Sequence, residues 1–154
     1  MKVNYKNVGY AVFAVLYTAA FAFLAGYFTD ARSEWFLSLN KGPLMPPDIA
    51  FAVIWFIIYI LLMISFTLVL ITSEGKSGLP FMINAALLAL WCYVFFYRHN
   101  INGGLLLIAA ITLESVLLFG YAYKKNRKAG YLLLPFIAWM GYATALNYHI
   151  ALLN

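Results

Sequence analysis

Five long apolar stretches fill most of this 154-residue chain and leave it few ways to fold. They cover residues 8–28, 48–72, 79–97, 103–123 and 130–153. A helix needs roughly 20 mainly apolar residues to cross the hydrocarbon core of a bilayer. The runs at 54–64 and 105–111 are continuously apolar, whereas the strands of a membrane barrel alternate apolar and polar residues. The sequence therefore predicts an all-α integral membrane protein, a bundle of five transmembrane helices.

The composition of the chain supports the same class. Apolar residues make up 66% and charged residues 10%, against roughly 45–50% and 25% in soluble proteins. We expect one membrane domain over residues 1–154, with short connections between the spans. The first stretch is too long for the apolar region of a signal peptide, so we expect it to be retained. Only the first connection, at 29–45, is long, and we interpret it as a candidate lid.

Lysine and arginine residues lie mostly on one side of the predicted bundle. Three lie on the side of the long loop (Arg32, Lys41 and Arg98), and seven lie on the side of the N-terminus: Lys2, Lys6, Lys76, Lys124, Lys125, Arg127 and Lys128. Because basic residues favour the cytoplasmic side, we expect a cytoplasmic N-terminus, with the long loop and the C-terminus outside. We interpret the basic edge as a topology signal facing anionic headgroups, and nothing indicates a nucleic-acid partner.

Few polar residues lie inside the spans, and each is a candidate for function. Glu114 lies in the middle of the fourth span, where an ionisable group is a functional candidate by default. We expect it to be protonated or to pair with a donor on a neighbouring helix, and the alternatives are a structural hydrogen bond and a proton-relay or ligand role. Asn84 and Asn147 can each link helices or present an amide to a ligand. No HExxH sequence, Cys/His cluster or glycine-rich phosphate loop is present, so the sequence supports neither a metal site nor conventional hydrolysis.

Three tryptophans lie within spans, although this residue prefers the membrane interface. They are Trp55, Trp91 and Trp139, on three different predicted helices. Core packing explains one such residue. Three suggest either packing or an aromatic cavity that suits a flat apolar ligand, and the residues alone leave these two interpretations evenly balanced.

Several segments resemble one membrane protein family in the correct order along the chain. These are 35–47 (WFLSLNKGPLMPP) with 53–55 (VIW), then Trp91 with Phe95-Phe96, then 134–139 (LPFIAW) with 143–147 (ATALN). They resemble the translocator protein family, also called tryptophan-rich sensory proteins or TspO. The likeness runs through nearly the whole chain.

This resemblance implies a five-helix bundle in a bacterial cell membrane, commonly a homodimer, with a pocket under the first loop. The expected ligands are porphyrins, such as protoporphyrin IX or haem, and no resident cofactor is required. The implied role is a membrane receptor or sensor. Photochemical degradation of the porphyrin would use Trp55 and Trp139, and the alternative is a small transporter or channel for tetrapyrroles or other apolar ligands. The ligand-binding residues carried over by position are Phe36, Pro43, Trp55, Tyr59, Trp91, Phe95, Trp139, Ala143, Leu146 and Asn147.

The chain also departs from the family pattern at identifiable positions. Leu44 replaces a usual Trp, and Gly42 separates Lys41 from Pro43. Leu88 stands where the family often has Asn, which removes a polar contact to a ligand. No basic residue follows Tyr148, so sterol recognition by that motif has little support.

Overall fold

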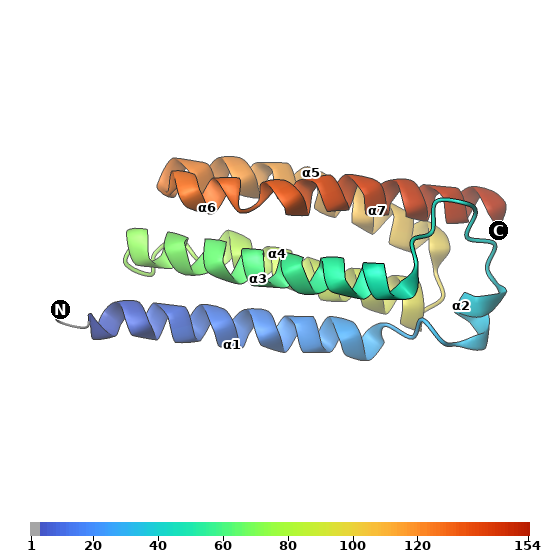
Figure 1. Cartoon of the computed structure of the whole chain (residues 1–154), viewed down its shortest axis with the longest axis horizontal. Coiled ribbons are helices and arrows are strands. Elements are labelled where there is room, and N and C mark those ends of the chain that lie inside the picture. The colour runs from blue at the N-terminus through green and yellow to red at the C-terminus, as the bar shows by residue number, and fades with distance from the viewer. Residues whose placement is uncertain (1–3) are drawn as a thin grey trace.

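The computed structural model describes residues 4–154, an array of helices running along one long axis (Figure 1). Lys2, which the orientation argument counts, lies outside the described residues. The elements follow in the order α1 (Tyr5–Phe28), α2 (Glu34–Ser38), α3 (Asp48–Thr72), α4 (Leu79–Cys92), the π-helical turn η1 (Tyr93–Tyr97), α5 (Ile101–Lys125), α6 (Arg127–Tyr131) and α7 (Leu134–Leu153).

Within residues 4–154, five helical segments are long and apolar enough to cross a membrane, which confirms the predicted fold class. They are Tyr5–Phe28, Asp48–Thr72, Leu79–Tyr97, Ile101–Lys125 and Arg127–Leu153. The ranges expected from the sequence lie within these segments. The third span combines α4 with η1, and the fifth combines α6 with α7.

Polar side chains and prolines set several helix ends. Asn100 begins α5 by accepting a hydrogen bond from the Gly103 amide at 2.8 Å. Asn126 separates α5 from α6, and its side chain accepts hydrogen bonds from the amides of Lys128 and Ala129. Such side chains satisfy amides that a helix start leaves unpaired. Proline lies in the first turn of both α4 and α7, where its missing N–H costs nothing.

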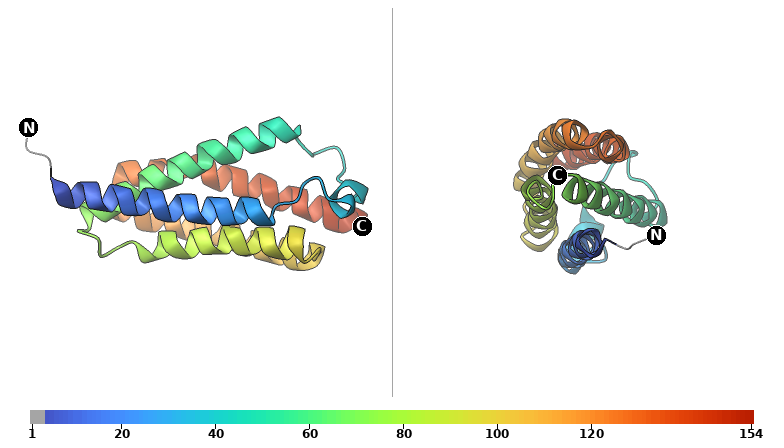
Figure 2. Two further views of the ribbon diagram at one scale, coloured as in Figure 1. Left: turned by 90° about the horizontal axis from the view of Figure 1, so that it is seen from below. Right: turned by 90° about the vertical axis from the view of Figure 1, so that its left-hand side faces the viewer.

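The five spans pack as a bundle in which α1 contacts α3 and α4, while α5 contacts α4 and α7. Figure 2 shows the N-terminal part of α3 diverging from α1 toward the end that carries α2. The backbones of α1 and α3 are thus farther apart at the end with the long loop, and α2 lies across this end of the bundle (Figure 1). The arrangement therefore places the loop predicted as a lid over a widening of the bundle.

The two ends of the bundle differ in charge. Among the described residues, the end with the α2 segment carries three basic and three acidic residues, and the opposite end carries six basic and one acidic. The first set is Arg32, Lys41, Arg98, Asp30, Glu34 and Asp48, and the second is Lys6, Lys76, Lys124, Lys125, Arg127, Lys128 and Glu74. This asymmetry is an observed property of the fold, whereas the side of the membrane that each end faces stays a prediction.

Candidate ligand-binding site

A cavity of about 360 Å³ lies between α1, α3, α4 and α7 beneath the loop that contains α2. Its volume falls in the range of small-molecule sites, roughly 300–1,000 Å³. Its walls are mainly apolar and aromatic, and they include Trp55, Tyr59, Trp91 and Phe95. Two of the three mid-span tryptophans therefore face a cavity rather than serving only as core packing.

Small residues on one face of α1 form the wall opposite these aromatic rings. Ala22, Ala25 and Gly26 line the cavity, and their spacing places them along one face of the helix. Thr29, the residue that follows the end of α1, also lines it. The space at Gly26 is open, because a Cβ added there would meet nothing within 4 Å. The sequence reasoning missed this wall, although the small-residue spacing could have indicated it.

Most of the carried-over site residues meet at this cavity. Three do not belong to its lining, namely Pro43, Trp139 and Ala143, and seven line it, namely Phe36, Trp55, Tyr59, Trp91, Phe95, Leu146 and Asn147. Cys92 and Arg32 also line the cavity. The sequence reasoning named neither of these two residues for the site.

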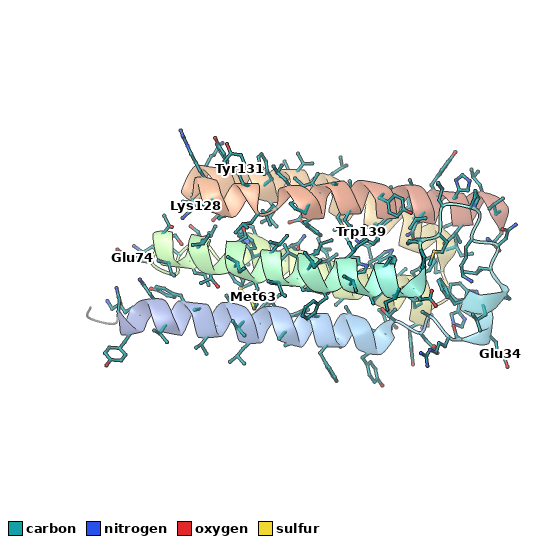
Figure 3. The ribbon with its side chains drawn as sticks, viewed as in Figure 1. Glu34, Met63, Glu74, Lys128, Tyr131 and Trp139 are labelled. Carbon is teal, nitrogen blue, oxygen red and sulfur yellow. The ribbon has the colours of Figure 1, made fainter. Side chains whose placement is uncertain are left out.

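Trp139 of α7 lies on the side of that helix that faces α3 (Figure 3), where its ring packs against the ring of Trp55. The two ring centroids are 6.2 Å apart and the ring planes are nearly perpendicular, at 89°. Phe51 packs against the same indole at 5.5 Å. The Trp139 Nε1 is a buried side-chain atom without a hydrogen-bond partner, the one such atom in the part of the chain described. A buried polar group without a partner is costly, so this N–H is available to an acceptor that reaches it.

The Trp91 ring is held in place from two directions. Its Nε1 donates to the Asn147 side-chain oxygen at 3.4 Å, and the Asn147 amide donates to the Ala143 carbonyl at 3.0 Å. Its ring also stacks on Phe95, with centroids 5.8 Å apart. Asn147 therefore links α4 to α7, which is one of the two roles that the sequence left open for it. It also lines the cavity, and a contact between its amide and a ligand stays a prediction.

The loop over the cavity is anchored at α2. Phe36 of α2 is buried, lines the cavity and packs against Phe96 at 5.2 Å. Trp35 stacks on His99, with centroids 4.3 Å apart and ring planes 13° from parallel. The Lys41 ammonium lies 4.5 Å from the centre of the Phe36 ring. These contacts hold α2 as a roof on the aromatic end of the cavity.

A second set of contacts fixes the part of the loop after α2. The Asn40 amide donates to the Asn154 side chain, which donates in return to the Asn40 carbonyl, both at 3.0 Å. The Tyr142 hydroxyl donates to the Leu44 carbonyl. Gly42 has a φ of 65°, and a Cβ there would lie 2.9 Å from His149, so this position favours glycine. The loop is thus attached to the middle of α7 by Tyr142 and to its C-terminal end by Asn154.

Glu114 does not line the cavity, and its partner is Asn84. The Asn84 amide donates to a Glu114 carboxylate oxygen at 2.6 Å, which joins α4 to α5. Asn84 is only 2% exposed. The interhelical pairing considered for both residues is therefore present.

Comparison with known proteins fits this architecture. The model of the TspO/MBR family matches residues 13–153. The chain belongs to the TspO/MBR family. It is 31% identical to an uncharacterized membrane protein, YtaB, of Bacillus subtilis over 94% of each chain. It is 30% identical to the tryptophan-rich protein TspO of Archaeoglobus fulgidus, over 96% of this chain and 99% of that one. With protein CrtK of Rhodobacter capsulatus it shares 28% identity over 93% and 92% of the two chains.

Membership of the TspO/MBR family and the five apolar spans show that the chain is an integral membrane protein. The family and the names of these relatives support a role of the sensor or transporter type.

Proposed function

We propose that this chain is a membrane receptor that binds a porphyrin, such as protoporphyrin IX, in the cavity beneath α2. The observation that carries the proposal is an apolar cavity of about 360 Å³ with Trp55 and Trp91 in its walls. A flat conjugated ring gains stacking and dispersion energy from such walls. The small side chains of α1 leave space on the other side of the cavity, so a wide ring can enter between α1 and the aromatic walls.

The mouth of the cavity adds a reason to favour a ligand with carboxylate groups. Arg32 and Asp48 both line the cavity and are exposed. A porphyrin with propionate groups would place its ring among the aromatic side chains and its carboxylates near the Arg32 guanidinium, which binds carboxylates well. Asp48 would repel a carboxylate, so we expect the propionates on the Arg32 side.

Light-dependent degradation of the bound porphyrin is a second candidate function, favoured by the contact between Trp55 and Trp139. An excited porphyrin can take an electron from the Trp55 indole in the cavity wall, and Trp139, with its ring centroid 6.2 Å away, can share the indole radical cation that remains. Dioxygen would add to the porphyrin radical anion, and the adduct would return one electron to the indole radical. The net reaction is then the addition of dioxygen to the porphyrin. We rank binding first, because degradation requires the same cavity and turnover in addition.

Transport is the alternative that the sequence raised, and Glu114 is its main support. That side chain pairs with Asn84 and lies outside the cavity lining, so the geometry favours a binding role over a route through Glu114. Unchanged substrate flux into proteoliposomes on Glu114→Gln would remove the remaining support for transport.

We also propose that the strongly basic end faces the cytoplasm, which places the N-terminus inside and the cavity mouth outside. A homodimer is a further proposal. It is compatible with Gly141 and Ala145, which lie exposed on α7 and would permit close approach of another helix. Cysteine accessibility from each side of the membrane tests the orientation, and cross-linking in native membranes tests the dimer.

Titration of the purified protein with protoporphyrin IX tests the main proposal. We expect saturable quenching of tryptophan fluorescence at one ligand per chain. Trp55→Phe should weaken or alter the quenching, whereas Tyr5→Phe is the control, because Tyr5 is exposed at the opposite end of the bundle and does not line the cavity. Quenching without saturation, equal to that in detergent alone, would exclude the proposed site. Illumination of the same complexes tests degradation, and bleaching that survives replacement of both Trp55 and Trp139 would contradict it.

A further inference from the structure

A second, much smaller cavity adjoins the first one deeper in the bundle. It measures about 10 Å³ and is lined by residues of α1, α3 and α4, including Thr18, Tyr59, Asn84 and Leu88. Tyr59 and Leu88 line both cavities, so these two side chains form the wall between them. A site for one buried water needs roughly 10–15 Å³ of such space and two to four polar partners. The small cavity therefore has the size of a single water.

Two buried polar groups border this cavity. Thr18 is 8% exposed and Asn84 is 2% exposed. Neither the Thr18 hydroxyl nor the Asn84 side-chain oxygen pairs with another group among the described residues, while the Asn84 amide nitrogen donates to Glu114. The Trp139 Nε1 is the one fully buried side-chain atom without a partner in that part of the chain, so the Thr18 and Asn84 oxygens each keep some accessible surface.

The hydrogen bonding of the Thr18 hydroxyl differs from that of other threonines in the spans. The hydroxyls of Thr67 and Thr112 each donate to the carbonyl four residues earlier in their own helix, at 2.8 and 2.9 Å. That contact is the usual way in which a helical threonine satisfies its hydroxyl in an apolar setting. The Thr18 hydroxyl forms no such bond within the described residues. Thr18 lines the small cavity, as does Asn84 from the facing helix.

We propose that the small cavity is a binding site for one ordered water molecule, which accepts a hydrogen bond from the Thr18 hydroxyl and donates one to the Asn84 side-chain oxygen. The water links α1 to α4, and the Asn84 amide extends the link to Glu114 of α5. The water also fixes the orientation of the Asn84 side chain, because its oxygen then faces the water and its amide nitrogen faces Glu114. Leu88 and Tyr59 separate this polar site from the ligand cavity.

Nuclear magnetic resonance on the ligand-free protein tests the site, using protein with ¹⁵N-labelled asparagine. The side-chain amide of Asn84, assigned by its loss in Asn84→Leu, should show a cross-peak to a bound water. Thr18→Val keeps the shape of the side chain but removes the hydroxyl, and it should abolish the cross-peak. Thr18→Ser should retain it, and Thr67→Val should leave it unchanged.

Two outcomes would overturn the proposal. One is the absence of the Asn84 cross-peak in the wild-type protein, and the other is its survival at full intensity in Thr18→Val. If Thr18→Val does not fold, a structure of the wild-type protein at a resolution that shows waters decides the question by density between Thr18 and Asn84. These tests require no porphyrin, so they are independent of the proposed ligand.

Discussion

The Asn84–Glu114 hydrogen bond gives the most quantitative prediction about stability. Glu114→Leu removes the acceptor and leaves the buried Asn84 amide unpaired. Hydrogen bonds between transmembrane helices contribute about 0.6 kcal/mol on average and up to about 1.7 kcal/mol. At about 2–4 °C per kcal/mol for a chain of this size, the melting temperature should fall by about 1–7 °C. Glu114→Gln keeps a side-chain oxygen that can accept from Asn84, so it should lose less than half as much.

Loss of the helical circular dichroism signal on heating provides the assay, because the described part of the chain is mainly helical. Asn84→Leu and the double variant complete a double-mutant cycle. The double variant should be about as stable as the less stable single variant. Strictly additive losses, or a Glu114→Gln variant as unstable as Glu114→Leu, would refute the assignment.

Three further predictions follow from the site and the packing. Trp55→Ala removes an aromatic wall worth about 1–3 kcal/mol of stacking, so the dissociation constant for protoporphyrin IX, measured by fluorescence quenching, should rise roughly 5- to 150-fold. Arg32→Gln removes the proposed ion pair with a ligand propionate, which at an exposed site is worth up to about 1 kcal/mol; titrations should show up to about fivefold weaker binding of protoporphyrin IX and unchanged binding of its dimethyl ester. Gly130→Ala places a Cβ 2.7 Å from that of Tyr123 and 2.8 Å from its Cα, which should cost about 1–3 kcal/mol in thermal unfolding; Gly120→Ala, with nothing within 4 Å, should stabilise by about 0.5–1 kcal/mol.

The fold could be predicted because hydrophobic length determines it. Each apolar run must satisfy its backbone internally within a bilayer, so the five spans follow from composition and order alone. Breaks inside a span are harder to see. The π-helical turn at Tyr93–Tyr97 and the division of the fifth span near Leu132 depend on local packing as well as on residues such as Pro135.

The site could be predicted in part, because aromatic residues and the family resemblance both pointed to the same end of the bundle. Trp55 and Trp91 line the cavity. Trp139 does not line the cavity, because the side chains of Trp55 and Phe51 pack against it on that side. Periodicity in the sequence does not show which of two neighbouring indoles faces the cavity. The α1 wall of the cavity was not predicted, because alanine and glycine contribute to a cavity by leaving space and carry no distinctive side chain.

Protection of Cys92 by a ligand is the most direct test that the cavity is the binding site. Its thiol belongs to a buried residue in the cavity wall, and the sequence contains no other cysteine. We predict that a small apolar maleimide labels Cys92 in the folded protein, and that protoporphyrin IX slows this labelling in proportion to the occupancy measured by fluorescence quenching. Saturable binding of the porphyrin with an unchanged rate of Cys92 labelling would place the ligand elsewhere and contradict the account.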